Sequence, residues 1–202
     1  MKRSYDVPLC CRCGHVRGVA REVSPSGGFR FVCYCTDCQA FARFLERPDV
    51  LDAAGGTDIF HMAAGRLSLT DGSDAVRCLT LSGKVLRWYA ECCRTPIANT
   101  AATARFPVVA LIHSVIDREG VGYPRSEIFG PPLCRIYERS ATAPLPPDAA
   151  PPPSVATFMR RGSKILGWWV RGLGRPNAFF DDRTGAPISA PHGLTTSDRL
   201  GI

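Results

Sequence analysis

The sequence predicts a mainly β protein followed by an amphipathic helix, and three observations support this fold class. Short runs of β-branched and aromatic residues recur through the first part of the chain, glycine and proline clusters separate them, and a proline-rich stretch then precedes one helical pattern. The predicted strands cover residues 15–23, 29–34, 57–61, 76–81, 85–89, 107–116 and 134–137. We therefore expect a β domain over residues 7–140, a linker over 141–153 and a helix with a tail over 154–202.

Composition places the chain among globular proteins of the reducing cytosol. The 202 residues are 45% hydrophobic, residues 1–20 hold no long apolar segment, and the apolar run at 108–112 is too short to span a bilayer. We expect a cytoplasmic protein, in which clustered cysteines bind metal more often than they form disulfides. The net charge of +7 comes mostly from arginines spread along the chain, so no nucleic-acid partner is expected.

One helix is predicted inside the β domain. Thr36 and Gln39 have the spacing of a capping box, and Pro48 lies beyond the last helical residue, so the helix is expected over residues 37–45. Cys38 then lies in the first turn, where unpaired amides and the helix dipole favour a thiolate.

The C-terminal part reads as a linker, a helix and a short tail. Six prolines within residues 143–153 predict an extended, semi-rigid linker. Residues 154–174 have helical periodicity, with apolar residues that include Trp169 on one broad face and basic residues on the other. Packing of the apolar face on the β domain, or on a second subunit in a homo-oligomer, is favoured over contact with an anionic membrane. The tail around Phe179 is expected to form a short strand and turn that docks on the core.

Most of the ten cysteines fall in three clusters, and these clusters carry the functional signal. The clusters are Cys11 and Cys13, then Cys33, Cys35 and Cys38, then Cys92 and Cys93. Three thiols within six residues can converge on one metal ion. Zinc sites with four protein ligands are typically structural, whereas sites with three ligands and an open position are typically catalytic. Cys78 and Cys134 lie in apolar strands and are predicted to be buried hydrophobic residues.

Three cysteine motifs follow one another in an order that resembles a known family. They are Cys11-Arg12-Cys13-Gly14, then Cys33-Tyr34-Cys35-Thr36-Asp37-Cys38, then Cys93-Arg94-Thr95-Pro96. This order is similar to that of the glutathione-dependent formaldehyde-activating enzyme family, which includes centromere protein V. The resemblance covers about residues 10–115. It implies a β-tent fold of short antiparallel sheets around zinc, and carbon–sulfur lyase activity on a thiol–aldehyde adduct such as S-hydroxymethylglutathione.

The resemblance also implies how the cysteines divide between two zinc ions. The structural ligands would be Cys11, Cys13 and Cys93, and the site near the thiol substrate would be Cys33, Cys35 and Cys38. A small thiol such as glutathione is the partner that this arrangement implies.

The last motif departs from the family pattern, Cys-x-x-Cys-Gly-Thr-Pro. Ala90 takes the place of the first cysteine, and Arg94 takes the place of the glycine. Cys92 is a possible substitute, although adjacent cysteines point apart in an extended chain. Cys10 and Glu91 are the alternatives, so the chain is expected to bind one or two zinc ions.

Two functions remain open from the sequence. In the first, a thiol binds beside the open zinc position, and Arg12, Arg43 or Arg87 grips its carboxylate. In the second, the chain is a non-catalytic binding or interaction module, and zinc supplies folding energy alone. The altered last motif and the scarcity of further catalytic groups favour the module, whereas the resemblance favours the lyase.

Overall fold

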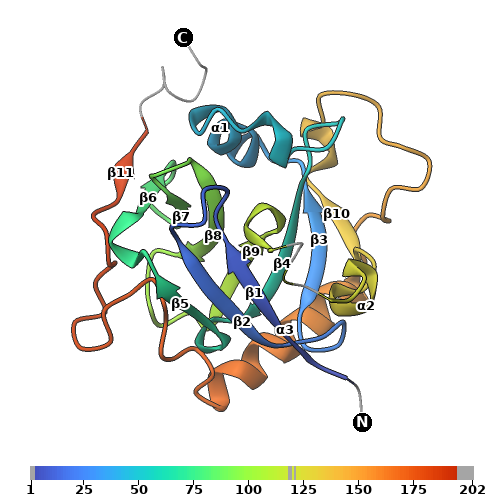
Figure 1. Ribbon diagram of the computed structural model, residues 1–202. Helices are drawn as coiled ribbons and strands as arrows, with labels where there is room; N and C mark the ends of the chain where they lie inside the picture. Colours follow the sequence, from blue (N-terminus) through green and yellow to red (C-terminus); the bar gives the residue numbers. More distant parts are fainter. Residues whose placement is uncertain (1–2, 118–119, 121, 195–202) are drawn as a thin grey trace.

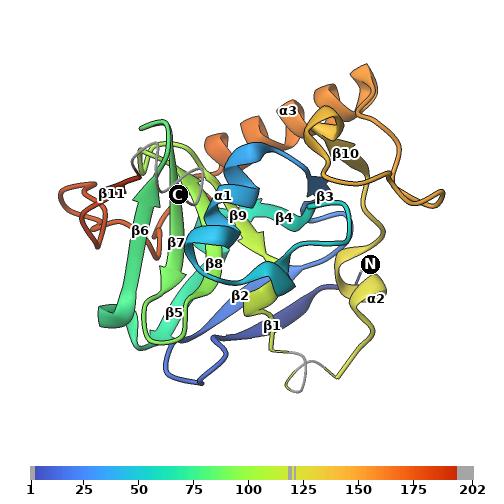
Figure 2. The same cartoon turned by 90° about the horizontal axis from the view of Figure 1, so that it is seen from above.

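A sheet of eight strands forms the centre of the molecule, with a three-stranded sheet packed on one face and the helices Thr36–Phe44 and Val155–Val170 on the other (Figures 1 and 2). The computed structural model describes residues 3–117, 120 and 122–194. The architecture confirms the prediction of a mainly β protein with a C-terminal helix. Each cysteine cluster lies where elements of two layers meet.

The smaller sheet has the strand order β1-β2-β5 and is antiparallel throughout. Its strands are β1 (Tyr5–Cys10), β2 (Arg17–Val23) and β5 (Leu67–Asp71). The sequence predicted β2 alone among them. Asp6 and Pro8 weaken the strand pattern of β1, but Tyr5, Val7 and Leu9 alternate with them and are buried against the larger sheet.

The larger sheet has the strand order β10-β3-β4-β9-β8-β7-β6-β11. Its strands are β3 (Phe29–Cys33), β4 (Thr57–Ala63), β6 (Val76–Thr80), β7 (Val85–Ala90), β8 (Thr95–Ala101), β9 (Val108–Ile112), β10 (Cys134–Ile136) and β11 (His192–Gly193). Neighbouring strands are antiparallel except at the two edges, where β10 runs parallel to β3 and β11 runs parallel to β6.

The register of the larger sheet decides which side chains face the helices. Arg87 is paired with Asn99, Asn99 with Ala110, and Ala110 with His61. Directly paired residues project from the same face of a sheet, so these four side chains lie in one row. Cys33 shares their face, because it lies four residues along β3 from the partner of His61. This register brings an arginine from β7 to the same face as the cysteine that ends β3.

The main core fills the space between the two sheets. Trp88, next to Arg87 in β7, points to the opposite face and is fully buried, and its indole N–H donates to Oγ1 of Thr100 at 2.9 Å. Phe179 from the C-terminal tail stacks on Trp88, with ring centroids 4.8 Å apart. The tail therefore contributes to the same core as the strands.

Helix α1 (Thr36–Phe44) covers the end of the larger sheet near Cys33. Its N-cap is Cys35, whose Sγ accepts a hydrogen bond from the Cys38 amide at 3.4 Å. Gln39 is buried and donates to two backbone carbonyls. The predicted capping box of Thr36 and Gln39 is therefore wrong, because two inward hydrogen bonds hold the Gln39 amide away from the helix start.

The other α-helices are α2 (Arg125–Phe129) and α3 (Val155–Val170), and single 3-10 turns occur at Pro48–Val50, Ala64–Arg66, Ser73–Ala75, His113–Val115 and Glu138–Ser140. Ser154 caps α3, since its hydroxyl accepts the Thr157 amide at 3.2 Å. Trp168 anchors α3 on the larger sheet against Phe29. Within the described ranges, no helix is long and apolar enough to cross a membrane.

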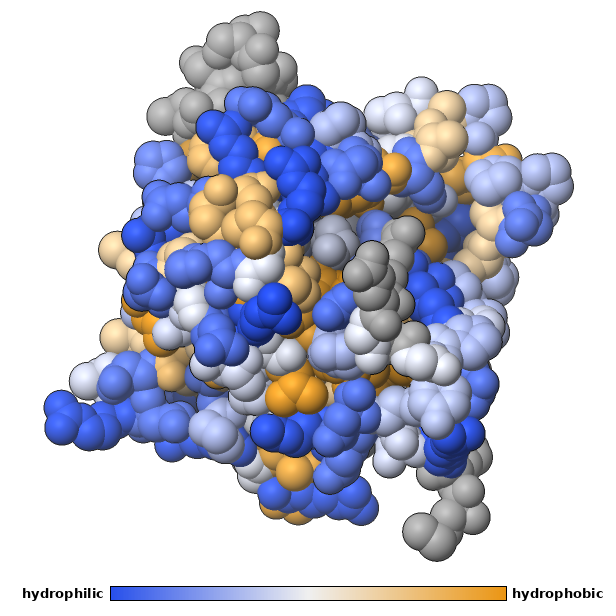
Figure 3. Space-filling view, in the orientation of Figure 1, coloured by the Kyte–Doolittle hydropathy of each residue, from blue (hydrophilic) through white to orange (hydrophobic). Residues whose placement is uncertain are grey.

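The proline-rich segment before α3 is attached to the β domain. The Arg135 amide donates to the Pro151 carbonyl, and the Thr142 amide donates to the Ala54 carbonyl, both at 2.9 Å. Polar side chains cover most of the face seen in Figure 3, with apolar side chains in small patches between them.

Candidate metal centres

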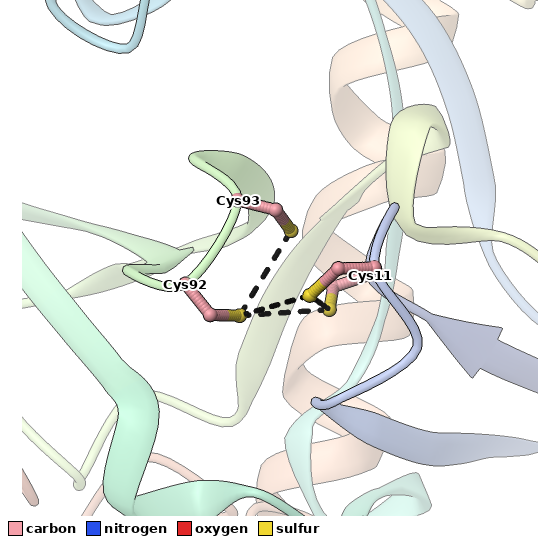
Figure 4. A group of neighbouring side chains, drawn as sticks. Cys11, Cys92 and Cys93 are labelled. Carbon is pink, nitrogen blue, oxygen red and sulfur yellow. Dashed lines mark hydrogen bonds between the residues drawn. The ribbon is translucent and has the colours of Figure 1, made fainter.

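The first candidate centre is a group of four cysteines from two distant turns (Figure 4). Two of them follow β1, and two lie in the turn that joins β7 to β8. The sulfur–sulfur distances are 3.6 Å for Cys11–Cys13, 3.8 Å for Cys11–Cys92, 3.4 Å for Cys13–Cys92 and 3.9 Å for Cys92–Cys93. We call this set the four-cysteine group.

These distances fit a single tetrahedral zinc ion. Zinc–sulfur bonds of about 2.3 Å in tetrahedral geometry place the sulfur atoms about 3.8 Å apart. Four thiolates are also a donor set that is typical of closed, structural zinc sites. The residues of the four-cysteine group therefore fit zinc in both their chemistry and their spacing.

Cys92 and Cys93 both reach the group because the chain turns at this point. Residues 91–94 form a turn, and Arg94 has a left-handed backbone with φ of 54°. In an extended strand the two adjacent side chains would point to opposite faces. Because the chain turns here, both side chains can point to the same group. Cys92 therefore supplies the fourth thiol, which Ala90 cannot supply.

The other residues considered for this place lie outside the group. Cys10 donates its thiol to the carbonyl of Cys11 at 3.3 Å, and Glu91 forms an ion pair with Arg77 at 2.8 Å. Ala90 is fully buried in the main core. The structure therefore brings Cys92 to the group, and leaves Cys10 and Glu91 away from it.

Thr95 supports the four-cysteine group, a role that sequence reasoning missed. Its hydroxyl oxygen lies 3.1 Å from Sγ of Cys93, and it accepts hydrogen bonds from the Arg12 amide at 3.0 Å and the Arg47 guanidinium at 3.2 Å. Thr95 and Arg47 are both buried. The signal in the sequence was the position of Thr95 within the last cysteine motif, two residues after Cys93, but Arg12 and Arg47 lie far away along the chain.

Cys93 ionises more readily than Cys11. Burial opposes ionisation of Cys93, but hydrogen bonds from Thr95, the Cys13 amide and the Cys11 thiol outweigh burial and lower the pKa of Cys93 to about 6. Burial raises the pKa of Cys11 above its usual value. A bound cation would offset the cost of holding several thiolates together.

The second candidate centre is the triad of Cys33, Cys35 and Cys38, whose sulfur atoms all lie within 4.8 Å of one another. Cys33 ends β3, Cys35 caps α1, and Cys38 lies in the first turn of α1. One strand-to-helix junction therefore supplies all three thiols. Among the residues that the structure describes, no further cysteine, histidine or carboxylate joins this group.

Arg87 brings a buried positive charge to the triad. Its guanidinium donates to Sγ of Cys38 at 3.6 Å and forms an ion pair with Asp37 at 3.5 Å. Of the three arginines that the sequence suggested for binding a carboxylate, Arg87 contacts the triad. Arg12 lies in the first turn of the four-cysteine group, and Arg43 lies in the last turn of α1.

Hydrogen bonds within the triad favour a thiolate on Cys35. Hydrogen bonds from Cys33 and Cys38 lower the pKa of Cys35 to about 2, and the charge of Arg87 acts in the same direction. Hydrogen bonding to Cys35, with a smaller contribution from hydrogen bonding to Cys38, raises the pKa of Cys33 above its usual range. A thiolate next to two thiols offers a soft donor set of the kind that zinc accepts.

Access to the triad is one-sided. Cys33 is 4% exposed and Cys38 is 6% exposed, and both pack against Ile59 and Ala110 of the larger sheet. Cys35 is half-buried. A small molecule from solution would therefore approach the triad on the side of Cys35.

A protein-family model matches residues 3–190, and its description is "Family of unknown function (DUF6151)". The chain belongs to this family. No curated protein matches the sequence. Both cysteine groups of this DUF6151 protein lie inside the matched residues, and each of the two could hold a metal ion.

Proposed function

We propose that this DUF6151 protein binds one zinc ion in each cysteine group and acts as a carbon–sulfur lyase on an adduct of a small thiol and an aldehyde. S-hydroxymethylglutathione is the example that the motif resemblance suggests. A β-tent fold and kinship with the glutathione-dependent formaldehyde-activating enzymes are part of the proposal. The observation that carries it is the division of seven cysteines into a group of four and a group of three.

The division matters because it gives the two centres different chemistry. Four thiolates complete the coordination of zinc, whereas three leave one position for a ligand from solution. Zinc bound at the triad would stabilise a substrate thiolate, as it stabilises hydroxide, by lowering the pKa of the bound group.

The residues around the triad would bind and orient the substrate. Arg87 balances the negative charge of the thiolates, and Asp37 holds the guanidinium in place from the solvent side. The buried Cys33 and Cys38 exclude water from the inner side of the site. In the reaction, the thiol sulfur forms a bond to the aldehyde carbon and its proton passes to the aldehyde oxygen. The reverse reaction breaks the same carbon–sulfur bond.

A non-catalytic module stabilised by zinc is the second candidate function. The burial of Cys33 and Cys38 favours it, because a buried triad offers a substrate little room. In this case Arg87 would serve to balance charge, and both zinc ions would contribute folding energy alone.

Zinc content and turnover, measured together, distinguish the two functions. Elemental analysis and native mass spectrometry would count zinc in the wild type, in Cys35→Ser and in Cys10→Ser, and NMR would follow the cleavage of thiol–aldehyde adducts. We expect two zinc ions and turnover in the wild type, and one zinc ion without turnover in Cys35→Ser. Cys10→Ser is the matched control, because Cys10 lies outside both groups, and it should behave as the wild type.

Two results would contradict the proposed lyase. A wild type that holds two zinc ions but cleaves no adduct of glutathione or of other small thiols faster than buffer would favour the module. A wild type without zinc would reject both functions.

A further inference from the structure

Helix α3 turns an apolar face to solvent. Its exposed large hydrophobic residues are Val155, Phe158, Met159, Leu166, Trp169 and Val170. At 100° per residue they form one continuous face of the helix. These six make up more than half of the ten large hydrophobic residues that are exposed in the described part of the chain. Exposed apolar surface on this scale, gathered on one element, marks an interaction site.

The sequence favoured a helix whose apolar face packs on the β domain or on a second subunit. In the structure, most of that apolar face does not touch the β domain. Trp168 is the tryptophan that anchors α3, with its ring centroid 5.9 Å from that of Phe29, and it is 5% exposed. Trp169 is 64% exposed. One step along a helix rotates the side chain by about 100°, so two adjacent tryptophans cannot both face the sheet. The sheet covers the side of α3 around Trp168 and leaves the wider apolar face uncovered.

Positive charge accompanies this apolar face. Residues 149–180 include five basic residues and no acidic residue. Arg160, Lys164 and Arg171 line a groove beside α3 together with Arg66. Arg66 and Lys164 have polar partners within the protein, and Arg160 and Arg171 are exposed. The helix therefore combines a solvent-facing apolar face with a basic polar face.

We propose that α3 docks this protein on an anionic membrane surface. Its apolar face would enter the boundary between headgroups and acyl chains, and Arg160 and Arg171 would contact lipid phosphates. Amphipathic helices with aromatic residues on one face and basic residues on the other lie in the plane of this interface. Figure 2 shows α3 along an outer edge of the molecule. The contact is peripheral, because no described helix can span a bilayer.

Charge favours lipid over a second copy of the chain as the occupant of this face. A two-fold dimer built on α3 would bring two copies of the same basic segment together. It would gain no ion pair from residues 149–180, because that segment contains no acidic residue. An anionic leaflet instead attracts each basic residue near its surface.

The test uses the full chain and two kinds of vesicle. One is pure phosphatidylcholine, and the other is phosphatidylcholine with phosphatidylserine at about three to one. We expect cosedimentation with the anionic vesicles and a blue shift of tryptophan fluorescence. The shift would report on Trp169, because Trp88 and Trp168 are already buried.

Two paired substitutions separate charge from apolar contact. Arg160→Gln with Arg171→Gln should weaken binding roughly twenty-fivefold, because each basic residue near the surface contributes roughly fivefold. Leu166→Ser with Trp169→Ser should weaken binding by at least about tenfold, because both apolar contacts are lost. Both pairs lie on exposed positions, so circular dichroism should show an unchanged fold.

Tyr137→Asn is the matched control. The side chain of Tyr137 is 65% exposed, which is close to the exposed fraction of Trp169. Asparagine tolerates the left-handed backbone at position 137. This variant should bind as the wild type does. No binding of the folded wild type to anionic vesicles would overturn the proposal, as would equal binding to both kinds of vesicle. A dimer that replaces vesicle binding, and that Leu166→Ser with Trp169→Ser dissociates, would also overturn it.

Discussion

The guanidinium of Arg87 lies 3.6 Å from the sulfur of Cys38, so a buried cation and a cluster of thiols share one space under α1. Arg87 comes from the middle of β7, and Cys38 comes from the first turn of a helix that lies 49 residues earlier in the chain. The sheet register that aligns Arg87 with Asn99 and Ala110 brings the two together. We regard Arg87 as a positioning residue that balances the charge of the triad.

Removal of the Arg87 charge should weaken metal binding at the triad. We expect Arg87→Met to release one zinc ion to a competing chelator at a concentration about tenfold lower than the wild type requires, because groups around metal ligands contribute about this much to affinity. Native mass spectrometry during chelator titration would measure it. Arg21→Met, at an exposed arginine that donates to Ser68, is the control and should change nothing. If Arg87→Met and the wild type released zinc at the same chelator concentration, Arg87 would not contribute to metal binding at the triad.

Cys92 should be needed for the four-cysteine group. Cys92→Ser replaces a sulfur that lies within 4 Å of three others, whereas Cys10→Ser changes a thiol outside the group. We expect Cys92→Ser to lose one zinc ion and to unfold at lower temperature, with zinc at the triad retained. Zinc content by mass spectrometry and melting by circular dichroism would test this. If Cys92→Ser kept two zinc ions, another residue would have to complete the site.

The stacking of Phe179 on Trp88 should stabilise the whole protein. Phe179 is fully buried, so Phe179→Ala should lower the free energy of unfolding by about 3–5 kcal/mol, through lost contact area and the cavity left behind. Phe106→Ala is a suitable control, because Phe106 is exposed, and we expect a loss of less than about 1 kcal/mol. Urea denaturation would give both values. Equal effects would show that the tail contributes little to the core.

Acid should destabilise the protein through His61. Burial, with a smaller contribution from Arg161, lowers the pKa of His61 from 6.5 to about 3. The unfolded chain therefore binds one more proton than the folded chain between these two pH values. Stability is fully present above pH 6.5 and falls as the pH drops toward 3.

His61→Leu should remove this part of the acid sensitivity. Urea denaturation at several pH values would show a smaller loss of stability below pH 6.5 in the variant than in the wild type. Protonation of the cysteine groups affects both proteins alike, so the difference between the two curves isolates His61. Parallel curves would mean that His61 takes up its proton without unfolding.

The local sequence pattern was enough to predict the strands that have strong runs of β-branched and aromatic residues, and to predict the C-terminal helix. Strands such as β3 and β7 begin at their predicted residues, because hydrophobic side chains and flanking turn residues agree there. The strands β1, β5 and β8 were missed, since their patterns are short or interrupted by polar residues, and pairing with distant strands and packing between the sheets stabilise them. The same reasoning found the cysteine triad, whose three thiols are neighbours in the chain.

Contacts between distant segments decided the rest. Spacing alone offered Cys92 as a substitute and left Cys10 and Glu91 open as alternatives, and the turn between β7 and β8 brings Cys92 to Cys11 and Cys13. Hydrophobic periodicity predicted an apolar face on α3. Periodicity describes a single helix, so it does not show how much of that face the larger sheet covers. The sheet is wide enough to cover the side of Trp168 and leaves Trp169 in solvent. Sequence patterns report local preference, whereas the neighbours of a side chain depend on which distant segments pack beside it.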